Sequence, residues 1–64
     1  MNLDLEERTM MTGLSILLVE DDAGLRKQLT AFLTRKGADV EPVGDLKAAR
    51  LQLSQGSYDF LLLD

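Results

Sequence analysis

Apolar and polar residues follow two different periods along the chain, and the changes of period predict where its elements begin and end. Residues 15–19 form a short, almost continuously apolar and partly β-branched run, which is typical of a strand covered on both faces. From Asp22 the period becomes helical, and Gly37 marks the end of this predicted helix. Its core-facing stripe consists of Leu25, Leu29, Phe32 and Leu33.

The second half of the chain repeats this order with a weaker first strand. Residues 38–44 predict a short extended segment, and Pro42 places it at a sheet edge because proline cannot donate a ladder hydrogen bond. Asp45 is the expected N-cap of a helix over 46–55, which Gly56 closes, and a last apolar strand runs over 58–63. On that helix the residues expected to face the core are Leu46, Ala49 and Leu53.

Strands that alternate with helices predict an α/β fold with a parallel sheet and right-handed crossovers. The uninterrupted strands, 15–19 and 58–63, belong in the interior, and the strand with proline belongs at an edge. The simplest β-α-β-α-β arrangement therefore has strand order 2-1-3. Residues 1–13 show no sustained period and are expected to form a flexible leader ahead of a unit over 14–64.

Composition excludes several classes of function. The 64 residues include neither cysteine nor histidine, so there is no disulfide, no thiolate metal site and no imidazole base. A net charge of −4 argues against contact of this segment with nucleic acid or an anionic membrane. No apolar run has the length of a membrane span, and the acidic start lacks the apolar core of a signal peptide. The expected location is the cytoplasm.

Acidic residues follow both interior strands. Glu20 and Asp21 leave the first strand at its carboxyl end, and Asp64 leaves the third at its own. Parallel neighbours lie about 4.8 Å apart, so these three carboxylates are expected to crowd at one edge of the sheet. Like charges this close need protons or a cation, and an all-oxygen set favours Mg²⁺. Such a site suits phosphoryl transfer, in which a carboxylate becomes an aspartyl phosphate.

The segments "ILLVEDD", "GDLKAA" and "YDFLLLD", in this order and spacing, resemble the first half of a response-regulator receiver domain of two-component signalling, over about residues 14–64. The resemblance implies a three-layer flavodoxin-like fold, with Asp64 as phosphoacceptor. It further implies that Asp21 binds Mg²⁺ directly and Glu20 through water, and that the phosphodonor is a histidine kinase or a histidine phosphotransfer protein. Asp22 is assigned first to capping the helix.

Parts of the family pattern lie beyond Asp64. Receivers continue with two strands that carry a Ser or Thr and a Lys at the phosphoryl group, and with a backbone carbonyl ligand just after the acceptor. Because residues 61–63 would form an unpaired apolar edge, the sequence is expected to be an N-terminal fragment.

Other interpretations stay open. A degenerate pseudo-receiver would act only as a protein-interaction module, and a fragment of an unrelated α/β hydrolase or phosphatase would use Asp64 as nucleophile. In the receiver interpretation, phosphorylation of Asp64 is a regulatory switch and not turnover of an external substrate. The chain is therefore not expected to be primarily an enzyme.

Simpler readings exist for individual residues. The acids after the first strand can complement a helix dipole, and Asp64 can be a solvated strand exit. Asp59 is read as strand entry, and Arg26 and Lys27 as a solvated helix face with a minor possibility of docking the phosphodonor.

Overall fold

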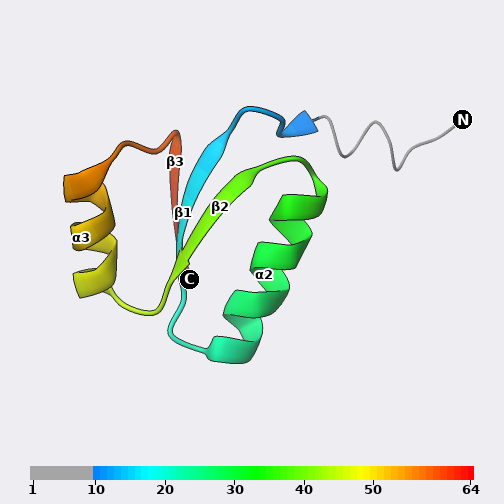
Figure 1. Cartoon of the computed structure of the whole chain (residues 1–64). Helices are drawn as coiled ribbons and strands as arrows, with labels where there is room; N and C mark the ends of the chain where they lie inside the picture. Colours follow the sequence, from blue (N-terminus) through cyan, green and yellow to red (C-terminus); the bar gives the residue numbers. More distant parts are fainter. Residues whose placement is uncertain (1–9) are drawn as a thin grey trace, which may run out of the picture.

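The computed structural model describes residues 10–64, and in this range the elements alternate as the sequence predicts (Figure 1). Residues 1–9, which make up most of the expected leader, lie outside the described range. The elements are β1 (Ser15–Val19), α2 (Ala23–Arg35), β2 (Asp39–Val43), α3 (Leu46–Gln55) and β3 (Phe60–Leu63).

The three strands form one parallel sheet in the order β2-β1-β3, which confirms the predicted fold class and strand order. Pro42 lies on the edge strand, opposite Leu18. The Asp39 N–H donates to the Leu14 carbonyl at 2.8 Å, and the Val43 carbonyl accepts from the Glu20 N–H at 3.1 Å. Since alternate residues of β2 thus bond to β1, Pro42 faces the outer edge, where its missing N–H removes no ladder bond.

Both helices begin at the aspartates that the sequence assigns as caps. The Asp22 carboxylate accepts the Leu25 N–H at 2.7 Å, and the Asp45 carboxylate accepts the Ala48 N–H at 2.8 Å. Each bond satisfies one of the amides that a helix start leaves without a partner. After α2 the chain turns at Gly37 with φ 101°, the left-handed conformation that favours glycine.

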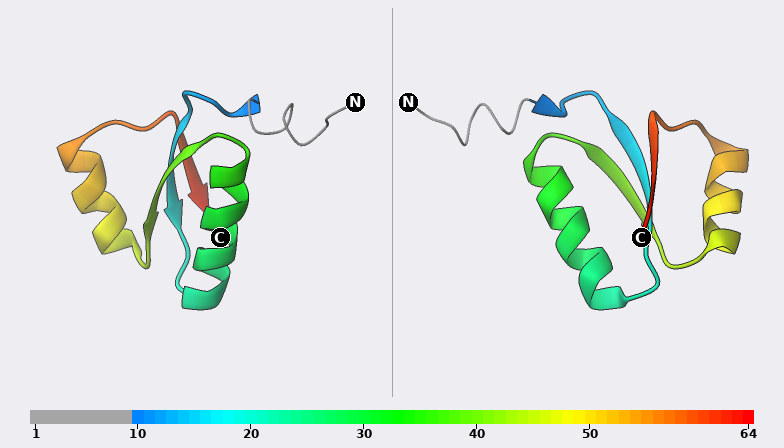
Figure 2. Two further views of the ribbon diagram at one scale, coloured as in Figure 1. Left: turned by 45° about the vertical axis from the view of Figure 1, so that its right-hand side comes forward. Right: turned by 180° about the vertical axis from the view of Figure 1, so that it is seen from behind.

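The sheet lies between the two helices, with α2 on one face and α3 on the other, as Figure 1 and both views of Figure 2 show. Alternate residues of β1 supply the two cores. Leu17 packs toward α3 in a cluster with Val19, Val43 and Ala49, and Ile16 packs toward α2 with Leu33 and Ala38. Burial of β1 on both faces, which the sequence predicts, is therefore confirmed.

The predicted inward face of α3 is confirmed at Ala49 and wrong at Leu46 and Leu53. Leu46 is 60% exposed and Leu53 is 45% exposed, whereas Ala49 is buried at 4%. At about 100° per residue, the side defined by Ala48, Ala49 and Gln52 lies roughly a quarter turn from the two leucines. The helix therefore presents small residues to the sheet, and its leucines flank the contact.

The predicted core-facing stripe of α2 differs from the structure at Phe32. On α2, Phe32 is 47% exposed, with the Lys36 ammonium 4.8 Å from its ring centroid, and Leu33 is the stripe residue that is buried.

The third strand begins at Phe60 rather than at residue 58. Ahead of it, the Asp59 carboxylate accepts the Ser15 N–H at 2.8 Å, which ties the start of β3 to the start of β1.

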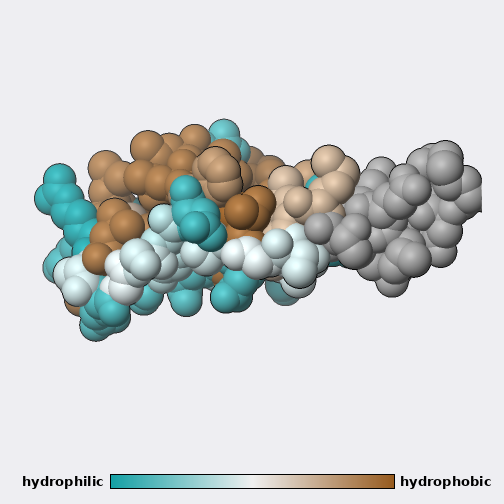
Figure 3. Space-filling model, turned by 90° about the horizontal axis from the view of Figure 1, so that it is seen from above, coloured by the Kyte–Doolittle hydropathy of each residue, from teal (hydrophilic) through white to brown (hydrophobic). Residues whose placement is uncertain are grey.

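Strand β3 forms the second edge of the sheet, and its four residues are 39–58% exposed. The interior position predicted for this run is therefore not found among the described residues, because no strand pairs with its outer side. Figure 3, a view from above, shows hydrophobic residues gathered along one side of the molecule.

At the other end of the described chain, Met11 packs against the Ile16 cluster, and its N–H donates to the Lys36 carbonyl at 3.0 Å. None of the helices within residues 10–64 has the length and apolar character needed to cross a membrane.

Candidate functional site

Three strand ends place the acidic residues at one edge of the sheet. Glu20 directly follows β1 and donates its N–H to Val43 at the end of β2. Asp64 directly follows β3, and its N–H donates to the Val19 carbonyl at 3.1 Å. The backbones that carry Glu20 and Asp64 are therefore neighbours, although 44 positions separate the two residues in the sequence.

Asp21 and Asp64 share an open hollow of about 590 Å³ at this edge. Both acids are exposed, so they keep contact with water. The remaining lining comes from the ends of β1 and β3 and from the turn before α3: Val19, Gly44, Asp45, Leu46 and Leu63. A hydrated cation fits in a space of this size, with an acid from each of two neighbouring strands on its wall.

Glu20 differs from the other two acids because it is buried, with 5% of its surface exposed. Burial raises the pKa of its carboxyl above the ordinary 4.5, and the negative charges of Asp64 and Asp21 raise this pKa further. A hydrogen bond from the Asp21 backbone opposes the rise. The carboxylate form of Glu20 is therefore disfavoured where it stands, and a cation nearby would favour it.

The side chains do not form a three-acid cluster. Across residues 10–64, no three acidic side chains are placed so that they could hold one metal ion together. Of the three acids that line the hollow, Asp45 is occupied by its bond to the Ala48 N–H, which leaves Asp21 and Asp64. In proteins Mg²⁺ takes one or two carboxylates and keeps several waters. Asp21 and Asp64 are therefore the two residues that would hold such an ion.

The other acids have structural roles. Asp22 and Asp45 cap helices, as the sequence predicts. Asp59 accepts from the Ser15 N–H and, at 3.4 Å, from the Ser15 hydroxyl, and its own N–H donates to the Ser15 carbonyl at 2.8 Å. It fixes the register of β3 on β1 at the edge opposite the candidate site.

Arg26 is the residue near the site that the sequence interpretation misses. It is half-buried, and its Nη1 donates to the Glu20 carbonyl at 2.8 Å, so it is not part of a solvated face. Lys27 is exposed, as expected. Helical periodicity could have distinguished the two cations, because Arg26 lies seven positions before the buried Leu33 and so borders the apolar stripe, whereas Lys27 lies a further ~100° around the helix.

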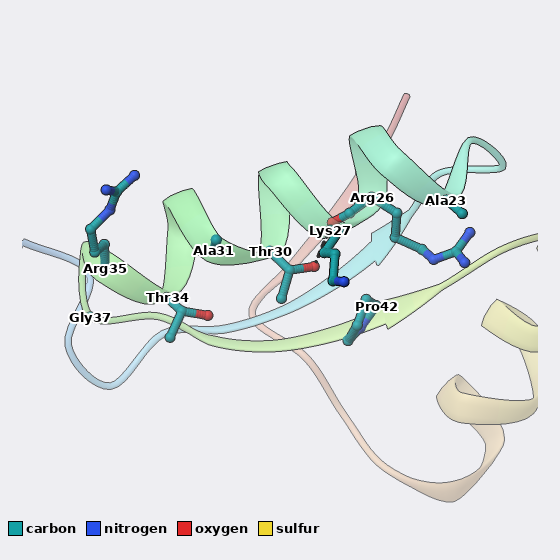
Figure 4. Close-up of a pocket in the computed structure, with 9 residues that line it drawn as sticks. All are labelled: Ala23, Arg26, Lys27, Thr30, Ala31, Thr34, Arg35, Gly37 and Pro42. Atoms are coloured by element: carbon teal, nitrogen blue, oxygen red, sulfur yellow. Dashed lines mark hydrogen bonds between the residues drawn. The ribbon is translucent and has the colours of Figure 1, made fainter.

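A larger hollow of about 1030 Å³ lies away from the acids, along α2 and the edge of β2 (Figure 4). Its charged lining is basic: Arg26, Lys27 and Arg35. Because none of its lining residues is acidic, this hollow is not the place where a metal would bind. Figure 4 shows Arg26 toward the end of the groove near Ala23, and Arg35 at the other end.

Comparisons of the chain with protein-family models, with curated proteins and with solved structures find no match. The site therefore has to be interpreted from its own residues.

Proposed function

We propose that this chain is a phospho-accepting signalling segment, similar to the first half of a receiver domain, in which Asp64 accepts a phosphoryl group. The observation that carries the proposal is the shared hollow of Asp21 and Asp64 at the carboxyl edge of adjacent parallel strands, beside the buried Glu20. Open parallel sheets bind ligands at this edge, where the strand order reverses. The exposed carboxylate of Asp64 can be reached by a donor from solution.

The chemical step is a transfer between a nitrogen and an oxygen. An Asp64 carboxylate oxygen attacks phosphorus in the phosphohistidine of a histidine kinase or histidine phosphotransfer protein. The new O–P bond forms as the N–P bond breaks, and the electron pair of that bond returns to the imidazole, which takes up a proton. Mg²⁺, when bound, supplies positive charge that offsets the repulsion between the carboxylates and the phosphoryl oxygens.

The chain's own residues have separate tasks in this proposal. Asp21 would hold the ion from the loop after β1, and Asp64 lines the same hollow from the end of β3. Glu20 acts from its buried position through water, which adds negative charge without occupying the hollow. In an intact domain the aspartyl phosphate would bias a two-state surface that controls an output.

The experiment combines a metal titration with a phosphoryl donor that has an N–P bond. The 64-residue chain is titrated with Mg²⁺ and followed by amide NMR, then incubated with phosphoramidate and Mg²⁺ and analysed by intact mass. We expect signals around Asp21 and Asp64 to move on titration, and a gain of one phosphoryl group that Asp64→Asn abolishes. Asp39→Asn is the matched control, since Asp39 is exposed at the start of β2, at the opposite edge. If Asp64→Asn accepted the phosphoryl group as well as the parent, the site assignment would be wrong.

A second candidate is a pseudo-receiver that acts as an interaction module without phosphorylation. The absence of a three-acid cluster among the described residues favours it. It predicts that Mg²⁺ moves no signals at Asp21 or Asp64 and that phosphoramidate adds no mass.

A further inference from the structure

Arg26 connects helix α2 to the backbone of the acidic loop. Its Nη1 lies 2.8 Å from the Glu20 carbonyl oxygen and donates a hydrogen bond to it. The helix holds Arg26 firmly at its own backbone, because the Arg26 N–H donates to the Asp22 carbonyl and the Arg26 carbonyl accepts from the Thr30 hydroxyl at 2.7 Å. The guanidinium therefore reaches the loop from a fixed base.

The same guanidinium lies against Gly44, in the turn after β2. A Cβ added at Gly44 would lie 3.2 Å from Nη1 and 3.8 Å from Cζ of Arg26. Gly44 does not have a positive φ, so its lack of a side chain matters for this close approach and not for the backbone conformation. Gly44 also lines the hollow that Asp21 and Asp64 share, so Arg26 contacts one residue of its wall.

The Glu20–Asp21 peptide connects Arg26 with the acids. A peptide group is planar, so fixing its carbonyl also fixes the direction of the N–H on the other side. That N–H belongs to Asp21, so the bond from Arg26 to the Glu20 carbonyl also orients the start of Asp21. One rigid peptide group thus connects Arg26 with Glu20 and with the residue proposed to hold the ion.

We infer that Arg26 is a positioning residue, which fixes the Glu20–Asp21 peptide against the turn at Gly44 and so holds Glu20 and Asp21 for the metal. The role of Glu20 and Asp21 in metal binding rests on the proposed function. The contacts of the Arg26 guanidinium with the Glu20 carbonyl and with Gly44, here called the clamp, are present in the metal-free chain. Arginine suits the position because its planar group has several donors and packs flat against a backbone, which an ammonium does not do.

The test uses three variants of the full 64-residue chain. Arg26→Met keeps the long apolar stem and removes the donors, and Gly44→Ala pushes on the guanidinium by the close contact described above. Lys27→Met is the matched control, because it removes one positive charge from the next, exposed residue of the same turn. Each variant is measured for Mg²⁺ affinity by NMR titration, for exchange of the Glu20 amide in a chelator, and for global stability in urea. The Glu20 N–H is suitable because it donates to the Val43 carbonyl at 3.1 Å, next to Gly44.

Arg26→Met should weaken Mg²⁺ binding by about 10- to 100-fold, the range found when a residue that orients a metal ligand is lost. In the chelator it should speed exchange of the Glu20 amide, which donates to the Val43 carbonyl, relative to the β1 amides, while Lys27→Met changes neither quantity. Gly44→Ala should produce the same local pattern in weaker form and add little to Arg26→Met, because both changes act on one contact.

The outcomes separate the clamp from the proposed function. Parental exchange of the Glu20 amide in Arg26→Met, or exchange that rises equally in all elements, would overturn the clamp. If the parent chain binds no Mg²⁺, the proposed function fails, but the exchange in chelator still decides the clamp. Should Arg26→Met not fold, Gly44→Ala decides it, and a Gly44→Ala chain with parental exchange of the Glu20 amide contradicts it.

Discussion

Truncation of Leu17 tests whether the sheet lies between the two helices as described. Leu17 is fully buried at 0% exposure, in the cluster that joins β1 to α3. Leu→Ala at such a site costs about 2–5 kcal/mol, from lost burial and from the cavity left behind. At about 0.05–0.15 kcal/mol per residue, a chain of this length has a total stability of about 3–10 kcal/mol. Leu17→Ala should therefore remove a large share of the free energy of unfolding.

The matched control is Leu53→Ala, the same chemical change at a residue that is 45% exposed on α3. Because only part of this side chain is buried and alanine is the better helix former, its cost should stay below about 1 kcal/mol. Urea unfolding followed by far-ultraviolet circular dichroism gives both values, with equal slopes indicating equal exposure of surface on unfolding. Equal losses for Leu17→Ala and Leu53→Ala would refute the placement of α3, and would instead support the inward Leu53 that the sequence predicts.

Three further predictions concern charged groups. The raised pKa of Glu20 means that the metal-free folded state binds this proton more tightly than the unfolded chain does; stability from Glu20 is therefore present below pH 4.5 and is lost as pH rises through the folded pKa. Glu20→Gln should then be more stable than the parent at neutral pH in a chelator, and the two stabilities should converge in acid. Urea midpoints measured as a function of pH test this. A variant less stable than the parent at neutral pH would contradict the burial and charge repulsion given as the cause of the raised pKa. Asp59→Ala should cost about 1 kcal/mol and loosen the start of β3, seen as faster exchange of the Ser15 amide; parental exchange there would contradict the bond. Asp45→Ala should cost about 0.5–2 kcal/mol through the lost bond to Ala48, measured by thermal unfolding; an unchanged midpoint would remove the cap's contribution.

Much of the fold follows from local rules that the sequence displays directly. An acid that accepts an amide three residues later starts a helix wherever it stands, so Asp22 and Asp45 can be identified without knowledge of tertiary structure. Pro42 predicts an edge strand, because a proline in a central strand would remove a ladder hydrogen bond. The continuous apolar run at 15–19 predicts a strand that is buried on both faces of the sheet. The order 2-1-3 combines these separate signals.

The parts that differ depend on contacts between distant residues. The rotation of α3 is set by how closely its alanines can approach β1 and β2, and the leucine pattern alone does not contain that distance. The bond between Asp59 and Ser15 spans 44 positions, and the bond from Arg26 to the Glu20 carbonyl ends on a backbone atom. In each bond one partner is a backbone group, the Ser15 N–H or the Glu20 carbonyl, and every residue type has that group. Neither bond could therefore be found from composition or period.

Burial of Glu20 is the feature that separates a binding site from ordinary helix electrostatics. Acids near the first turn of α2 would gain from its dipole while remaining in water, as the exposed Asp22 does. Nothing in that explanation requires an acid to be buried beside two further acids, where burial and like charge both raise its pKa. The burial of Glu20 and its repulsion by Asp21 and Asp64 occur at the carboxyl edge of the sheet, where a bound cation would offset both. Strand β1, which ends at Glu20, is packed in hydrophobic clusters on both faces. Binding of a cation there should therefore add to the stability of the fold by mass action, in proportion to its affinity for the folded chain.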